Sequence, residues 1–405
     1  MVANRWPDLK VGELGQVITG RTPSTDRPSY FGDDFPFITP GDMRQGKYAR
    51  DSQRGLSHEG VALLNRILLP ANSVCVSCIG WQMGEVIMTD RPSISNQQIN
   101  TIVPNGKVDP SFLYYSLRTR KQELLSLGAT TGVRTPILNK SAFCETKVKV
   151  PPLSVQQRIA GILSAYDDLI ENSQRRIKIL DTMVRALYQD WFIHFRFPGF
   201  ENHPRVASAM GEIPQGWEVK KLGEIAEEMR RNVRKGELDG PQNYVGLEHI
   251  PRRSLALDAW DTMTDLGSNK LEFKRGEVLF SKIRPYFHKV SVAPFDGLCS
   301  ADTIIIRAHR PEHHAFVVAC ASSDDFVAHA TTTSNGSKMP RANWAVLRDY
   351  KVVIPSSKVS EQFSTFFADM IAQQQALVFQ IQNLSRTRDL LLPRLLSGQI
   401  TVEAA

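Results

Sequence analysis

The amino-acid sequence predicts an α+β fold in which two related globular domains are joined by two long antiparallel helices. Two observations support this prediction. Similar segments recur in the two halves of the 405-residue chain, and a long stretch with helical periodicity follows each half. At about 100–200 residues per domain, the length allows two or three domains with cores of their own. We expect globular domains at 1–150 and 201–354, one long helix within 151–200 and another within 355–405.

Four pairs of similar segments occur in the same order in the two halves. Residues 6–14 align without a gap on residues 217–225, which lie 211 positions later. The other pairs are 204 positions apart and are 70–79 with 274–283, 132–139 with 336–343, and 148–151 with 352–355. A repeat of this length indicates a duplicated domain, because solenoid repeats are about 20–50 residues long. The alternative is a chance similarity between strand patterns.

Each half is predicted to contain strands before its helical stretch. The segments with strand-like composition are 74–78, 143–150, 278–281 and 349–354. The helical stretches start just after the aligned prolines Pro151 and Pro355. In each stretch the apolar residues follow alternating steps of three and four, which is the spacing of one heptad seam.

The two seams have few polar interruptions: Ser173 in the first, Gln374 and Arg388 in the second. Each helix of roughly 40 residues would be about 60 Å long, which is too long to pack on one small domain. We therefore expect the seams to bury each other as an antiparallel coiled-coil bar with a pseudo-twofold axis. The alternative is that each helix packs on its own domain.

The charge, the apolar segments and the cysteine content of the chain indicate which classes of protein fit it. The chain has 49 Lys+Arg against 42 Asp+Glu, a net charge of +7, which fits a nucleic-acid partner and also fits a merely basic soluble protein. The first residues contain no apolar segment typical of a signal peptide, and no run approaches eighteen apolar residues. With five cysteines, an odd number, we expect a reduced, cytoplasmic protein without a membrane span.

The sequence contains no complete catalytic motif. Residues 41–48 approach a phosphate-binding loop, but Tyr48 stands where a Ser or Thr hydroxyl would bind magnesium. Cys75 and Cys78 form half of a zinc motif without its second half, and we interpret Cys75 as a core residue. Glu145 and Lys147 resemble half of a nuclease metal site, but no nearby Asp completes it. The sequence favours a non-catalytic binding protein; a nuclease or a purely architectural protein are the alternatives.

A dense aromatic run over residues 191–200 ends the first helical stretch. Aromatic side chains at this density favour burial. One interpretation is a core plug between this helix and the second domain. The other is a docking surface for another subunit, formed by Trp191, Phe192 and Phe195.

Six segments resemble the specificity (S) subunit of type I restriction-modification systems. They are FITPGDM at 37–43, PPLSVQQRIAGIL at 151–163, DWFIHFRFPG at 190–199, IPQGW at 213–217, LFSKIRPY at 279–286 and LLPRLLSGQI at 391–400. The resemblance covers nearly the whole chain and both repeats. One departure is the Val before Gln-Gln at 156–157, where the family commonly has Glu.

The resemblance implies two target recognition domains, held apart by the two helices, that each read one half of a split sequence in double-stranded DNA. It also implies that the helices set the spacing and carry two modification (M) subunits, which bind S-adenosylmethionine and methylate adenine. Restriction (R) subunits, driven by ATP with Mg²⁺, complete the nuclease. The chain itself would then hold no cofactor or metal. Because the loops differ between the halves, we expect an asymmetric bipartite site with half-sites about one helical turn apart.

Basic and polar residues in predicted loops are the candidates for DNA contact, because Lys and Arg neutralise phosphates and Arg can pair with guanine. In the first domain they are Thr39, Asp42, Arg44, Lys47 and Arg134. In the second they are His249, Arg252, Lys282, Arg284, Tyr286, Lys338 and Arg341. A solvated charged surface is the alternative for each cluster. The sequence does not separate phosphate contacts from base contacts.

Overall fold

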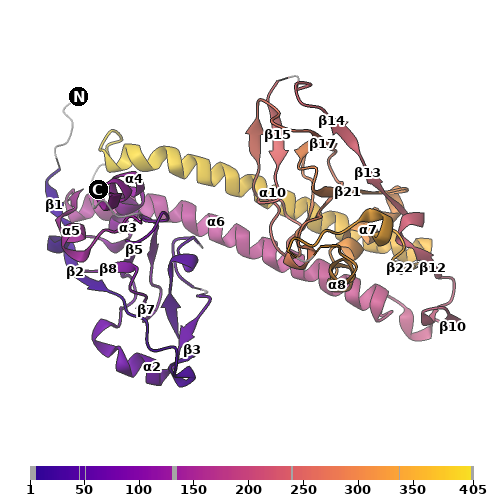
Figure 1. Ribbon diagram of the computed structural model, residues 1–405, viewed down its shortest axis with the longest axis horizontal. Helices are drawn as coiled ribbons and strands as arrows, with labels where there is room; N and C mark the ends of the chain where they lie inside the picture. Colours follow the sequence, from indigo (N-terminus) through magenta and orange to yellow (C-terminus); the bar gives the residue numbers. More distant parts are fainter. Residues whose placement is uncertain are drawn as a thin grey trace. The chain divides into compact units, whose positions relative to one another are not determined.

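The computed structural model describes residues 6–44, 46–50, 52–129, 135–238, 240–336 and 338–402. The chain forms two compact units. Unit 1 comprises Met1–Glu171 and Asn383–Ala405, and unit 2 comprises Asn172–Gln382. The two long helices, α6 (Leu153–Tyr188) and α10 (Ser357–Leu396), each contribute one part to each unit (Figure 1). The sequence predicted both helices at these places.

Unit 1 is built on an antiparallel sheet with the strand order β2-β8-β5-β6. Its strands are β2 (Gly15–Thr19), β8 (Ile99–Pro104), β5 (Val74–Ser77) and β6 (Val86–Met88). A smaller sheet contains β4 (Gly55–Leu56), β3 (Phe31–Ile38) and β7 (Ile94–Ser95). The strands β1 (Asp8–Lys10) and β9 (Lys147–Lys149) form a separate pair.

Short helices pack on the two sheets of unit 1. They are α1 (Val11–Leu14), α2 (His58–Leu63), α3 (Pro110–Arg118), α4 (Lys121–Ala129) and α5 (Lys140–Glu145), with α2 on the smaller sheet. Side-chain caps begin three of them, as in α3, where Asp109 accepts a hydrogen bond from the Phe112 amide at 2.9 Å. The α3 aromatic residues Phe112, Tyr114 and Tyr115 are buried in the core of this unit.

Unit 2 has the same kind of antiparallel sheet, in the order β13-β21-β18-β19. The strands are β13 (Ala226–Met229), β21 (Thr303–Ala308), β18 (Val278–Ser281) and β19 (Val290–Val292). Its second sheet has five strands: β14 (Arg231–Val233), β17 (Lys270–Phe273), β20 (Gly297–Cys299), β15 (Gln242–Val245) and β16 (Asp261–Met263). The two remaining strand pairs are β12 (Glu218–Lys221) with β22 (Lys351–Ile354) and β10 (Arg205–Ser208) with β11 (Gly211–Pro214). The short helices are α7 (His314–Ala321), α8 (Asp324–Thr332) and α9 (Trp344–Leu347).

The internal repeat predicted from the sequence is confirmed by equivalent backbone hydrogen bonds. In unit 1 the Gly80 amide donates to the Pro136 carbonyl at 2.9 Å, and 204 positions later the Arg284 amide donates to Pro340 at 2.8 Å. The helical turn after β1 and the one after β12 are capped in the same way, by Glu13 and Glu224. A chance similarity of strand patterns would not reproduce individual hydrogen bonds.

Within each unit the segments of α6 and α10 pack in antiparallel fashion. In unit 1, Arg388 near the end of α10 pairs with Asp167 of α6 at 2.5 Å. In unit 2, Gln374 in the first half of α10 donates to Asp181 of α6 at 2.9 Å. The polar interruptions Gln374 and Arg388 therefore have buried partners on the opposite helix. Neither helix packs only on its own preceding domain, which corrects the alternative interpretation.

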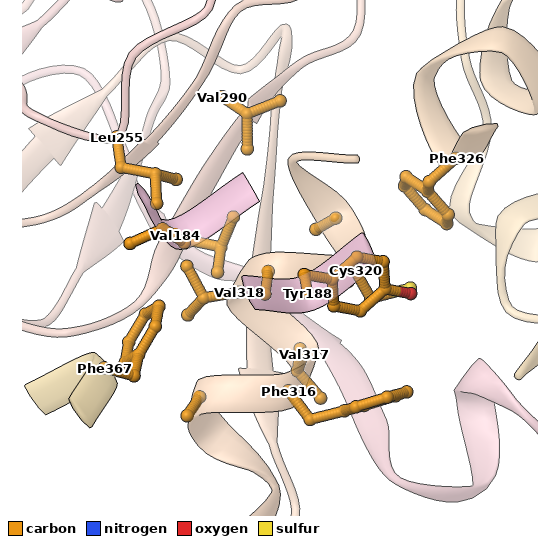
Figure 2. Packing of buried hydrophobic residues seen from close by; sticks show 14 of the residues in the cluster. Val184, Tyr188, Leu255, Val290, Phe316, Val317, Val318, Cys320, Phe326 and Phe367 are labelled. Atoms are coloured by element: carbon orange, nitrogen blue, oxygen red, sulfur yellow. The ribbon is translucent and has the colours of Figure 1, made fainter. Parts of the chain in front are cut away.

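The core of unit 2 joins both helices to the sheet and to α7. Figure 2 shows Val184 and Tyr188 of α6 beside Val318 and Cys320 of α7, with Phe367 of α10 nearby. All five side chains are buried. Burial of this much apolar surface, at about 25 cal/mol per Å², anchors the helices on unit 2.

Candidate nucleic-acid interface

The predicted DNA-contact residues of unit 2 gather on two neighbouring loops. The turn after β18 covers residues 282–289, and the segment before α9 covers residues 338–341. Backbone hydrogen bonds join them: the Arg284 amide donates to Pro340 at 2.8 Å, and the Ala342 amide donates to Lys282 at 2.9 Å. We call these two loops, together with Arg252, the basic loop cluster. It brings together Arg252, Lys282, Arg284, Tyr286, Lys338 and Arg341.

Phe287 lies at the centre of this cluster. The guanidinium carbon of Arg252 lies 4.1 Å from the centroid of the Phe287 ring, and that of Arg284 lies 5.8 Å from it. The Tyr286 ring packs edge-on against Phe287 at 4.8 Å, and Tyr286 is 51% exposed. Contacts of this kind hold planar cations over an aromatic face. In the sequence, Tyr286 and Phe287 stand beside Lys282 and Arg284, which indicates mixed stacking and charge, but only Tyr286 of the two aromatic residues is among the predicted DNA contacts.

The backbone is strained at two residues of the cluster and at Arg253, which follows Arg252. Arg253, Arg284 and His288 have φ values of 56°, 51° and 52°, in the left-handed region. This conformation costs a residue with a Cβ roughly 1–2 kcal/mol. At the positions of unit 1 equivalent to Arg284 and His288, the chain has Gly80 and Gly84, with φ values of 94° and 85°. Unit 2 thus keeps side chains where unit 1 keeps glycine.

The basic side chains of the cluster differ in their partners. Lys282 is mostly buried, donates to the Ala301 carbonyl at 3.2 Å and lies 3.6 Å from Glu228. Arg341 is exposed and lies 3.6 Å from Asp302, a surface pair worth less than about 1 kcal/mol. Within the described ranges, no carboxylate pairs with Arg252, Arg284 or Lys338. These three are the cations most available to an anionic ligand.

His249 has a structural role in the turn after β15. Its Nδ1 accepts a hydrogen bond from the Gly246 amide at 3.0 Å, and its Nε2 lies 3.5 Å from Asp261. The side chain is only 14% exposed. In the structure, His249 therefore stabilises the turn after β15 and does not lie on the surface of the basic loop cluster.

Thr39 and Asp42, two residues of unit 1 predicted to contact DNA, instead form hydrogen bonds that stabilise their own loop. One Asp42 oxygen accepts hydrogen bonds from the Thr39 amide at 2.9 Å and the Thr39 hydroxyl at 2.7 Å. The other accepts from the Gln53 amide at 2.8 Å. Asp42 is fully buried, so its prediction as a DNA contact is wrong: the carboxylate caps the turn Pro40–Asp42. Thr39 is half-buried in the same loop.

Lys47 is also turned inward, which corrects its prediction as a DNA contact. Its side chain is buried, and Nζ donates to the Ser164 hydroxyl of α6 at 2.7 Å. The ammonium lies 5.2 Å from the Tyr48 ring and 5.4 Å from the Tyr115 ring. Burial lowers the pKa of Lys47 and outweighs the opposite effect of Asp167. Lys47 therefore ties its loop to α6.

The remaining surface of unit 1 carries one predicted residue and one that was missed. Arg44 is exposed and lies 3.4 Å from Glu85, which also accepts from Lys121 at 2.6 Å. Trp81 is 72% exposed on the turn equivalent to 282–288, one position before the equivalent of Tyr286. The alignment of the repeats was the signal that could have identified Trp81. Arg134 lies outside the described residues.

The chain is similar to known specificity subunits of type I restriction enzymes. Residues 4–181 match the family model described as type I restriction modification DNA specificity domain. The chain is 26% identical to the type I restriction enzyme MjaIX specificity subunit of Methanocaldococcus jannaschii, over 98% of this chain and 94% of that one. Residues 4–181 thus match a type I restriction modification DNA specificity domain, and the chain is similar to a specificity subunit over nearly its whole length. The resemblance identified from the sequence is confirmed.

Two further specificity subunits extend the comparison. The HindI specificity subunit of Haemophilus influenzae is 34% identical, over 46% of this chain and 41% of that one. The crystal structure of a type I restriction-modification S subunit from M. genitalium matches with a TM-score of 0.59 at 14% identity. It covers 98% of this chain and 97% of that chain, which supports the fold.

The first aromatic residues of the run that follows α6 belong to the core of unit 2. Trp191 and Phe192 are buried, and the Phe192 ring centroid lies 4.7 Å from that of Phe363 in α10. Phe195 is partly buried and packs edge-on against Trp217 at 5.6 Å. The prediction of a subunit-docking surface is therefore wrong for Trp191 and Phe192, which unit 2 itself covers, whereas for the partly exposed Phe195 it stays a prediction.

The motifs that suggested other chemistry have structural roles. Burial raises the pKa of Cys75 to about 12 and that of Cys78 to about 11. Glu145 pairs with Lys10 at 2.6 Å on the surface. Among the described residues no group of three or more His, Cys, Asp or Glu could hold a metal ion, and none of the described helices is long and apolar enough to cross a membrane.

Proposed function

We propose that units 1 and 2 are target recognition domains, each of which reads one half of an asymmetric bipartite site in double-stranded DNA. The single observation that carries this proposal is the repeated loop framework with different exposed side chains. The turn 78–84 and the turn 282–288 share their backbone hydrogen bonds, but the first presents Trp81 and the second presents Arg284 and Tyr286. Two similar frameworks with different surfaces suit two different base sequences.

The long helices are the surface that we assign to the modification subunits. They expose large apolar side chains, including Ile162 on the unit 1 part of α6 and Phe366 on the unit 2 part of α10. These two residues are 204 positions apart and therefore equivalent in the repeat. Exposed apolar side chains at equivalent positions suit two copies of one partner. Two modification subunits would bind there, with S-adenosylmethionine, and restriction subunits with ATP and Mg²⁺ would join that complex.

In this proposal the chain is a cytoplasmic, non-catalytic recognition subunit that holds no cofactor. The helices set the distance between the half-sites, about one helical turn of DNA. The competing nuclease function makes a different prediction: the purified chain alone would cleave DNA with Mg²⁺. No contact among the described residues favours that function.

Methylation mapping by single-molecule sequencing tests the proposal directly. The chain and its candidate modification subunit are expressed together in cells that lack other adenine methylation. We expect one adenine-methylated motif with two different half-sites and a spacer without sequence preference. A palindromic motif would contradict the assignment of different half-sites to the two units. No methylation from a soluble, co-purifying complex would contradict the function as a whole.

A further inference from the structure

Arg284 combines three features that no other described basic residue of the basic loop cluster has together. Its φ of 51° places it in the left-handed region, its guanidinium has no carboxylate partner in the described ranges, and its Nε is buried without a hydrogen-bond partner there. A buried donor without an acceptor is unfavourable, and so is the backbone conformation. The free chain thus keeps an arginine at a position that a glycine would occupy more easily.

We propose that Arg284 reads a guanine in the major groove of the half-site bound by unit 2, whereas Lys338 contacts the phosphate backbone. The inference rests on the proposed function and names the base that this unit recognises. A guanidinium can donate two parallel hydrogen bonds to the O6 and N7 atoms of guanine. That geometry needs a planar cation without a competing carboxylate and with restricted motion.

The contacts of Arg284 meet these requirements. Its backbone amide donates to Pro340 at 2.8 Å, so the residue is held between the two loops of the cluster. Its guanidinium shares the Phe287 ring with Arg252, which restricts the motion of the plane. The positive charge of neighbouring Arg252 adds to that of Arg284 and favours the guanine edge, whose two acceptors carry partial negative charge.

Lys338 shares with Arg284 the lack of a carboxylate partner in the described ranges, but it differs in its exposure and in its aromatic contacts. It is exposed, and the described residues offer it no aromatic ring and no carboxylate. A flexible ammonium of this kind interacts with phosphate as a point charge and carries little base information. The two residues therefore form a matched pair within one cluster.

The equivalent position of unit 1 supplies the design of the test variant. Gly80 has the same backbone hydrogen bond, from its amide to Pro136, and no side chain. Arg284→Gly therefore removes the guanidinium while it relieves the strained backbone, so we expect the variant to fold. Arg284→Lys keeps the charge and removes the two parallel donors.

The test uses the full chain with its modification subunit and duplexes that carry the wild-type motif with one position changed at a time. We expect Arg284→Gly to reduce the preference for guanine at one position of the unit 2 half-site by roughly ten- to a hundredfold. Arg284→Lys should lose most of the same preference. Lys338→Ala should weaken binding to all duplexes about equally and leave the motif unchanged.

Three outcomes would overturn the inference. The wild-type motif could lack guanine on both strands of the unit 2 half-site. Arg284→Gly could weaken all duplexes equally, which would make Arg284 a phosphate contact. Arg284→Gly could also leave the motif and the affinity unchanged. If the wild-type complex binds DNA without any sequence preference, the proposed function itself fails, which is a separate result from the other three.

Discussion

The turn 78–84 of unit 1 and the turn 282–288 of unit 2 have the same backbone and different side chains. The Cys78 amide donates to Gln98 at 2.8 Å, and the Lys282 amide donates to Asp302 at 2.9 Å, 204 positions later. The flanking serines donate their amides at 3.0 Å in both turns, Ser77 to Glu85 and Ser281 to Lys289. Backbone hydrogen bonds do not depend on side-chain identity, so the framework can persist while the exposed residues change.

The difference between the turns lies at their left-handed positions. Unit 1 uses Gly80 and Gly84, and unit 2 uses Arg284 and His288. The exposed aromatic residue is Trp81 in the first turn and Tyr286 in the second. A duplicated scaffold therefore tolerates a conformational cost of about 1–2 kcal/mol per residue at positions where the side chain makes contacts of its own, as Arg284 and His288 do.

The helix segments of the two units differ in a comparable way. In unit 1 the carboxylate of Asp167 is held by Arg388 and by the Tyr115 hydroxyl, both at 2.5 Å. In unit 2 the carboxylate of Asp181 is held by Gln374 and by the Leu255 amide, both at 2.9 Å. Each aspartate therefore joins both helices to its own unit, with a charged partner in unit 1 and neutral partners in unit 2.

The largest effect is expected from Arg388→Leu. The variant leaves Asp167 buried without its charged partner, which typically costs about 3–5 kcal/mol. Gln374→Leu is the matched variant in unit 2, and it should cost about 1–3 kcal/mol because it removes only a neutral donor. Guanidinium chloride unfolding of both variants measures the difference. Equal losses would show that charge is not what distinguishes the two helix contacts.

Alanine substitutions at Gly80 and Gly84 should distinguish the free-energy cost of backbone strain from that of a steric clash. A Cβ at Gly84 would lie 2.9 Å from the Lys121 Cα, whereas a Cβ at Gly80 would meet no atom within 4 Å. We expect Gly84→Ala to cost about 2–4 kcal/mol and Gly80→Ala about 1–2 kcal/mol. Thermal unfolding of each variant provides the measurement. A larger destabilisation by Gly80→Ala would show that the clash with Lys121 is not what restricts position 84.

Removal of the exposed aromatic residue of each turn should affect DNA binding on opposite half-sites. We expect Trp81→Ala and Tyr286→Ala each to lower specific affinity by about three- to tenfold through lost contact with base edges. Duplexes with one half-site scrambled identify which half each variant affects. Val346→Ala, at an exposed apolar residue of α9, is the control and should bind normally. If both aromatic variants lost affinity for the same half-site, the proposal that each unit reads its own half-site through this turn would be contradicted.

The smallest expected effect is a change in the pH dependence of stability caused by His288. Burial lowers its pKa below 6.5, and Arg253 nearby acts in the same direction while Asp324 opposes it. The unfolded chain therefore binds the proton first, and this contribution to stability is lost as the pH falls below about 6.5. His288→Gly, which copies Gly84, should unfold with a weaker dependence on pH between about 7 and 5.

The control for His288 uses two partly buried histidines of unit 2, His313 and His314. Burial also lowers the pKa values of His313 and His314, so the wild-type protein and His288→Gly should both keep part of the slope. Melting temperatures measured in parallel at several pH values give the difference. Identical slopes would mean that His288 stays neutral or charged to the same extent in both states.

Part of the candidate site was predictable from sequence because the repeat supplies an alignment. The alignment places Lys282, Arg284 and Tyr286 on a turn beside the segment of Lys338 and Arg341, and the structure joins these two loops. The predictions of Asp42 and Lys47 are wrong because polar side chains in loops can face inward as well as outward. The partners of these two side chains, the Gln53 amide and the Ser164 hydroxyl, are too far along the chain for any local pattern to indicate.

The amino-acid sequence by itself determined the duplicated α+β units, the two long helices and the family resemblance, because these depend on repeated local patterns with a constant offset. Only the tertiary structure decided which polar and aromatic residues are available at the surface. The packing of α10 against α6 gave Arg388 and Gln374 their buried partners, and the core of unit 2 covered Trp191 and Phe192. Exposure is a property of elements brought together from distant parts of the chain, and the energy of burying a group depends on the partners that it finds there.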